Sequence, residues 1–163
     1  MKLPKSGGCQ CWQVRYEITE EPQAVYTCHC LDCQRLTGSA FSLGIVVPEK
    51  AFRLKGIEPR RLQRTADSGR VNTRLVCPEC GSWICGIPRD GVVRVRGGTL
   101  DDRSWLRPTK HIWTRRKQPW VKLPRAMKSS RDSLPDSTAS FTTVLVGVFR
   151  ATKAGALTRS SSF

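Results

Sequence analysis

The sequence predicts a mainly β fold of short antiparallel strands, stabilised by zinc bound at the turns. Apolar and polar residues alternate without a break in residues 12–18, which is typical of a strand with one buried face. Cysteines gather at turn positions, and nothing before residue 124 has the pattern of a long amphipathic helix. Because short strands enclose little continuous core, we expect bound zinc to contribute part of the folding free energy.

The remaining elements follow from apolar runs and turn residues. A single helical turn is expected between Leu31 and Thr37, closed by Gly38. Asp101 and Asp102 are placed to cap a turn before Trp105. Further strands are expected in residues 24–27, 41–47, 52–54, 82–87 and 92–96, together with a hairpin formed by residues 61–64 and 70–76.

Composition divides the chain. Residues 1–123 hold every cysteine and histidine, and their length suits one domain with its own core. Residues 124–163 are rich in Ser, Thr, Ala and Arg, which predicts a largely disordered tail. The apolar segment 141–149 within it is too short to span a membrane and fits either a strand or an aggregation-prone segment.

The charge is strongly basic, with 28 Lys and Arg against 13 Asp and Glu and a formal net charge of +15. Seven cysteine thiolates binding two zinc ions would lower this to about +12. Such a surplus favours either a nucleic acid or a small acidic substrate. The basic residues are scattered rather than gathered in one block, which weakens the case for nucleic acid.

The eight cysteines favour metal binding over disulfides, because seven of them follow C-x-C and C-x-x-C spacing. No apolar signal-peptide core precedes Cys9, and no apolar run reaches the ~18 residues of a membrane span. We therefore expect a reducing, cytoplasmic location. Four thiolates close a tetrahedral zinc shell, so a structural zinc is predicted on the pairs Cys9, Cys11, Cys77 and Cys80.

The central run supplies only Cys28, Cys30 and Cys33, and three ligands leave one exchangeable position for water or a substrate thiol. The alternative is that Cys85 closes the site as a fourth ligand, although a lone cysteine on a strand is more often a small core residue. His29 is expected either to support a ligand or to be exposed. His111, beside Trp113, is more typical of a structural histidine than of a catalytic one.

Three motifs together resemble the glutathione-dependent formaldehyde-activating enzyme family. They are GGCQC at residues 7–11, CHCLDCQRLTGS at 28–39 and CPECG at 77–81, with a closing segment at 108–113 and 118–120. The resemblance implies a β-tent fold, a structural zinc on the outer pairs and a catalytic zinc on the central three. It also implies carbon–sulfur lyase chemistry, in which glutathione adds reversibly to formaldehyde. Trp12 departs from the glycine that is usual in the family, and residues 124–163 have no recognised counterpart.

The expected function is that of a zinc-dependent carbon–sulfur lyase acting on a glutathione–aldehyde adduct such as S-hydroxymethylglutathione. Arg35 and Lys110 are the candidate partners of the glutathione carboxylates. The alternative is a zinc-stabilised basic module that binds nucleic acid or another acidic partner. The sequence predicts no membrane association and leaves the oligomeric state open.

Overall fold

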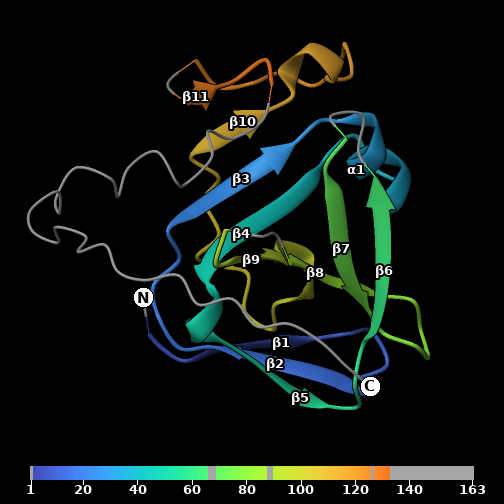
Figure 1. The fold of residues 1–163 in the computed structure, drawn as a ribbon. Coiled ribbons are helices and arrows are strands. Elements are labelled where there is room, and N and C mark those ends of the chain that lie inside the picture. The colour runs from blue at the N-terminus through green and yellow to red at the C-terminus, as the bar shows by residue number, and fades with distance from the viewer. Residues whose placement is uncertain (1, 66–68, 88–89, 126, 133–163) are drawn as a thin grey trace, which may run out of the picture.

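The computed structural model describes residues 2–65, 69–87, 90–125 and 127–132. Two sheets form the fold (Figure 1). The smaller one lies at the base of the picture and consists of β1 (Lys5–Gly8), β2 (Val14–Ile18) and β5 (Phe52–Gly56), all antiparallel. The described residues thus confirm the prediction of a mainly β fold with short strands.

The larger sheet has eight strands in the order β11-β10-β3-β4-β9-β8-β7-β6. Its neighbours are antiparallel except that β10 runs parallel to both β3 and β11. The strands are β3 (Ala24–Cys28), β4 (Ser42–Pro48), β6 (Arg60–Thr65), β7 (Val71–Val76), β8 (Trp83–Ile87), β9 (Val92–Arg96), β10 (Lys110–Ile112) and β11 (Lys128–Ser129).

The main core includes the inner face of the small sheet and apolar side chains of the large one. In β2, Val14, Tyr16 and Ile18 are buried while the residues between them are not, as the alternation predicted. They belong to one apolar cluster with Ile45 of β4 and Val95 of β9. The strand begins at Val14 rather than at residue 12, because Trp12 takes a left-handed conformation with φ 66°.

One α-helix is found in the described residues, α1 (Leu31–Thr37), where a helical turn was expected. Cys30 precedes it, and its sulfur accepts a hydrogen bond from the backbone N–H of Cys33 at 3.4 Å. Gly38 ends it in the left-handed conformation, with φ 60°. The 3-10 helices are η1 (Glu49–Ala51), η2 (Gly97–Thr99) and η3 (Thr114–Arg116). No described helix is long and apolar enough to cross a membrane.

The edge formed by β10 and β11 differs from the sequence-based expectation, which had no strand there. β11 lies beyond residue 124 and pairs with β10, so this short part of the expected tail is ordered against the domain. Ser130 N–H donates to the carbonyl of His111 at 2.7 Å. The segment 141–149 lies outside the described residues. The division at residue 124 stays a prediction.

Candidate metal centres

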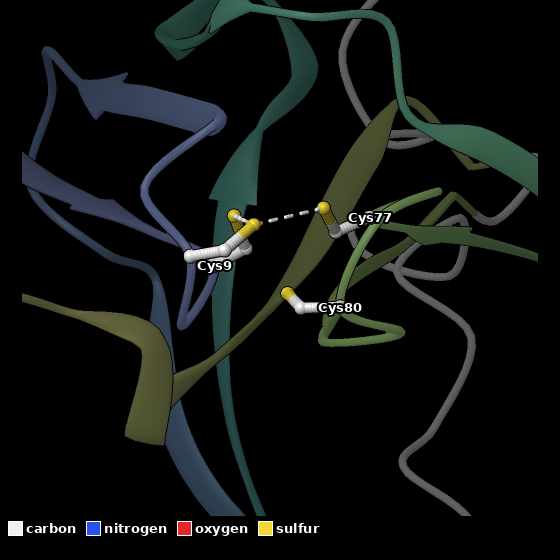
Figure 2. A group of neighbouring side chains, drawn as sticks. Cys9, Cys77 and Cys80 are labelled. Carbon is white, nitrogen blue, oxygen red and sulfur yellow. Dashed lines mark hydrogen bonds between the residues drawn. The ribbon is translucent and has the colours of Figure 1, made fainter.

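The outer cysteines come together from turns of the two sheets. Cys9 and Cys11 lie between β1 and β2, and Cys77 and Cys80 follow β7 (Figure 2). All four sulfurs lie within 4.8 Å of one another, with 3.4 Å between Cys9 and Cys11 and 3.6 Å between Cys11 and Cys77. A tetrahedral zinc with Zn–S bonds of about 2.3 Å needs sulfurs about 3.8 Å apart. These four side chains therefore fit a zinc ion.

Hydrogen bonds favour the thiolate forms of Cys9 and Cys80, whereas burial and the neighbouring sulfurs raise the pKa of Cys11 to about 12. The N–H of Val14 donates to Cys9 Sγ at 3.2 Å. The hydroxyl and backbone N–H of Ser82 lower the pKa of Cys80 to about 5, with 3.2 Å between Ser82 Oγ and Cys80 Sγ. Ser82 Oγ also accepts from the backbone N–H of Gln10 at 3.1 Å, which joins the two turns.

Trp12 occupies the tight turn beside this cluster. Its φ of 66° lies in the region that glycine adopts most readily. Its N–H donates to the carbonyl of Cys9 at 3.1 Å, and its side chain is 65% exposed. The guanidinium of Arg15 stacks over the indole at 4.4 Å. The turn thus admits a bulky residue without separating Cys9 from Cys11.

The central cysteines converge where a strand gives way to a helix. Cys28 ends β3, Cys30 caps α1, and Cys33 lies in its first turn. Their sulfurs lie within 4.8 Å of one another, and no further His, Cys, Asp or Glu joins this group in the described part of the chain. The arrangement fits a metal ion held by three sulfurs, with a further position open to another ligand.

Cys85 belongs to neither group. It is fully buried in the apolar cluster between the sheets, on β8. Burial raises the pKa of its thiol to about 12, so it remains protonated at neutral pH. Its surroundings are those of a core residue, which is the interpretation that the sequence favoured.

The electrostatics of the central cluster favour negative charge on Cys33. Hydrogen bonds from Cys28 and Cys30 lower the pKa of Cys33 to about 2, against the effect of burial. The hydroxyl of Ser42 and the positive charge of Arg96 act in the same direction. The same sulfur contacts raise the pKa of Cys28, so the first thiolate of the three forms at Cys33.

Both histidines are buried and contact the same hydroxyl, that of Thr27. His29 Nε2 lies 3.2 Å from Thr27 Oγ1, which also bonds His111 Nδ1. His111 Nε2 lies 3.2 Å from the sulfur of Met127. Burial lowers the pKa of both imidazoles, which favours their neutral forms. One of the two expectations for His29, that it is exposed, was wrong, because the residue is fully buried.

A shallow hollow of about 560 Å³ opens beside α1, the helix that carries Cys33. Arg35 lines it, whereas Lys110 is half-buried on β10 and is not part of its lining. Apart from Ala40, the other lining residues belong to the sequence motifs, which gave them no role. The lining residues are Gln34, Arg35, Gly38, Ser39, Ala40, Gln118 and Trp120.

A family model described as glutathione-dependent formaldehyde-activating enzyme matches residues 4–116, a segment that includes every cysteine and both histidines. Among solved structures, a crystal structure of a Rhodobacter sphaeroides protein is similar at 17% identity. The match covers 59% of this chain and 87% of that one, with a TM-score of 0.47. The search of curated proteins finds no match.

Proposed function

Because the chain belongs to the glutathione-dependent formaldehyde-activating enzyme family, we propose that it is a zinc-dependent carbon–sulfur lyase acting on a glutathione–aldehyde adduct. Formaldehyde and glutathione, combining to S-hydroxymethylglutathione, are the model reactants. The observation that carries the proposal is the convergence of Cys28, Cys30 and Cys33 without a fourth ligand in the described residues.

Two zinc ions would have different roles. Cys9, Cys11, Cys77 and Cys80 would hold a structural ion that links the two sheets, because four sulfurs saturate tetrahedral zinc. Cys28, Cys30 and Cys33 would hold the catalytic ion. Zinc held there supplies a positive charge that favours the thiolate form of a bound thiol at neutral pH.

The residues around α1 would bind and orient glutathione. Arg35 is exposed at the hollow and would pair with a glutathione carboxylate through a charge-assisted hydrogen bond. Lys110 remains a second candidate, but the case for it is weaker than for Arg35 because Lys110 does not line the hollow. In the forward reaction the glutathione sulfur bonds to the carbonyl carbon, and the proton lost from the thiol ends on the new hydroxyl oxygen.

The test is magnetisation-exchange NMR between formaldehyde hydrate and the glutathione adduct, since this measures acceleration above the spontaneous reaction. Cys30→Ser should lower the acceleration at least tenfold and release one zinc per chain. Cys85→Ala is the matched control, because this cysteine lies outside both clusters, and it should retain two zinc ions and the activity. Full acceleration by Cys30→Ser would rule out a catalytic role for the central cluster.

A second candidate function, binding of nucleic acid or another acidic partner, is supported by β6. All six of its residues are exposed, including Arg60, Arg61 and Arg64. Arg64 is partly neutralised by Asp32 at 2.8 Å. Such binding would weaken steeply with salt. Retention on heparin at physiological salt that is lost in Arg60→Ser/Arg61→Ser would support this function, and elution below that salt would exclude it.

The proposal extends to organisation and location. Residues 1–123 would form the catalytic domain, with 124–163 as an appended tail whose β11 pairs with β10 of the domain. None of the eight cysteines is joined in a disulfide, which favours a reducing compartment such as the cytoplasm.

A further inference from the structure

Arg96, at the end of β9, is a buried cation, with only 8% of its surface exposed. Its guanidinium stacks on Trp83 at 4.0 Å and donates to Tyr26 Oη at 3.4 Å and to the carbonyl of Arg94 at 3.1 Å. No ion pair joins it to a carboxylate in the described part of the chain. Burying an arginine without a negative partner is costly, so a counter-charge is expected nearby.

Backbone register holds the guanidinium in place. Tyr26, Gly44 and Arg96 face one another in a single row across β3, β4 and β9. A Cβ atom on Gly44 would lie 2.4 Å from the Tyr26 ring, so only glycine lets this ring lie over β4 and reach Arg96. Tyr26 and Trp83 thus confine the arginine on the face of the sheet that carries Cys28.

Ser42 connects this arginine to the central cysteines. Arg96 Nη1 donates to Ser42 Oγ at 3.2 Å. Ser42 is the direct cross-strand partner of Cys28, so their side chains lie on the same face of the sheet, and it is only 1% exposed. Because the oxygen of Ser42 already accepts from Arg96, its hydroxyl hydrogen remains available for donation to a cysteine sulfur.

We propose that Arg96 is the counter-ion of the central site, and that Ser42 relays its charge to the cysteine sulfurs as a hydrogen-bond donor. Three thiolates and one Zn²⁺ carry one surplus negative charge, and a fourth thiolate adds a second. A buried positive charge one hydroxyl away favours the state with four thiolates. Arg96 is therefore a positioning residue that increases the affinity of the site for a substrate thiol. This inference rests on the proposed function in placing zinc on the three central cysteines and in identifying that thiol as glutathione.

The test uses the zinc-loaded protein and 2-mercaptoethanol as the probe. This thiol has no carboxylate, so its binding does not report on Arg35. Arg96→Gln should weaken its binding at least tenfold in calorimetric titration while the outer zinc is retained. Arg96→Lys, which keeps the charge, should restore most of the affinity, and Ser42→Ala should weaken it severalfold.

Arg74→Gln is the matched control. Arg74 also stacks on Trp83, at 5.4 Å, but it does not bond Ser42, so its loss should leave thiol affinity unchanged. Wild-type affinity in Arg96→Gln and Ser42→Ala would overturn the inference. If Arg96→Gln fails to fold, Ser42→Ala decides the outcome alone. Thiol binding that depends on Arg96 without any acceleration of adduct formation would support the counter-ion and refute the proposed reaction.

Discussion

Gln118 donates a hydrogen bond of 2.7 Å from Nε2 to Oε1 of Gln34, which ties the segment after β10 to helix α1. Gln34 in turn donates to the carbonyls of His29 at 2.6 Å and Arg116 at 2.8 Å. Its amide is therefore fixed in one orientation at the wall of the hollow.

Loss of the hydrogen bond between Gln118 and Gln34 should affect substrate binding more than turnover. Gln118→Ala leaves Gln34 Oε1 without its donor, at a cost of about 1 kcal/mol. We expect KM for glutathione to rise severalfold while kcat stays close to that of the wild type, because the central cysteines are untouched. Gln63→Ala, on exposed β6, is the control. An unchanged KM in Gln118→Ala would show that the hollow does not bind glutathione.

The two turns of the outer cluster should respond oppositely to substitution. Trp12→Gly removes the conformational strain of a non-glycine residue at φ 66°, which stabilises the fold. It also removes the stacking of Arg15 on the indole, which destabilises the fold. The first effect is about 1–2 kcal/mol and the second about 0.5–1 kcal/mol, so the variant should be slightly more stable. Gly81→Ala introduces the same strain at φ 70°, and should lower stability by about 1 kcal/mol and loosen the outer zinc. Denaturant unfolding of both variants measures the difference, and a destabilised Trp12→Gly would contradict the assignment of strain.

Much of this fold could be predicted from local patterns. Strict alternation identified β2 because the small sheet has one buried face, and turn residues located the β6–β7 hairpin. β10 and β11 were missed because strands of three and two residues carry no periodicity and form through pairing with distant segments.

The cysteine spacing predicted which sulfurs would meet, and the structure brings those same residues together in two groups. Their roles as zinc ligands stay predictions. The environment of Arg96 could not be anticipated, because the alternating Val and Arg residues of β9 suggest a solvent-exposed face. Trp83 and Tyr26 in fact cover this arginine, and they approach it from other strands.

Cys85 should make the protein less stable in alkali. Its folded pKa of about 12 lies above the ordinary value of 9.0, so the protonated thiol stabilises the fold fully below pH 9. As the pH rises from 9 towards 12 this contribution is lost, by up to about 1.4 kcal/mol per pH unit. Cys85→Ala should cost stability at pH 7 through a cavity but flatten the decline between pH 9 and 11. Urea unfolding across this range is the measurement, and equal slopes in both proteins would contradict the prediction.

The position of the domain boundary can be tested by two truncations. A chain ending at residue 132 keeps β11, the contact of Met127 with His111 and the hydrogen bond from Trp113 N–H to the carbonyl of Asp132. It should match the full chain in zinc content and Tm. A chain ending at residue 123 loses all of these contacts, so its Tm should fall by several degrees, since each hydrogen bond contributes about 1 kcal/mol. Both should keep two zinc ions per chain, because every cysteine lies upstream.

A lower Tm in the 132-residue chain would show that residues 133–163 also pack on the domain, whereas an unchanged Tm in the 123-residue chain would place the boundary at residue 124.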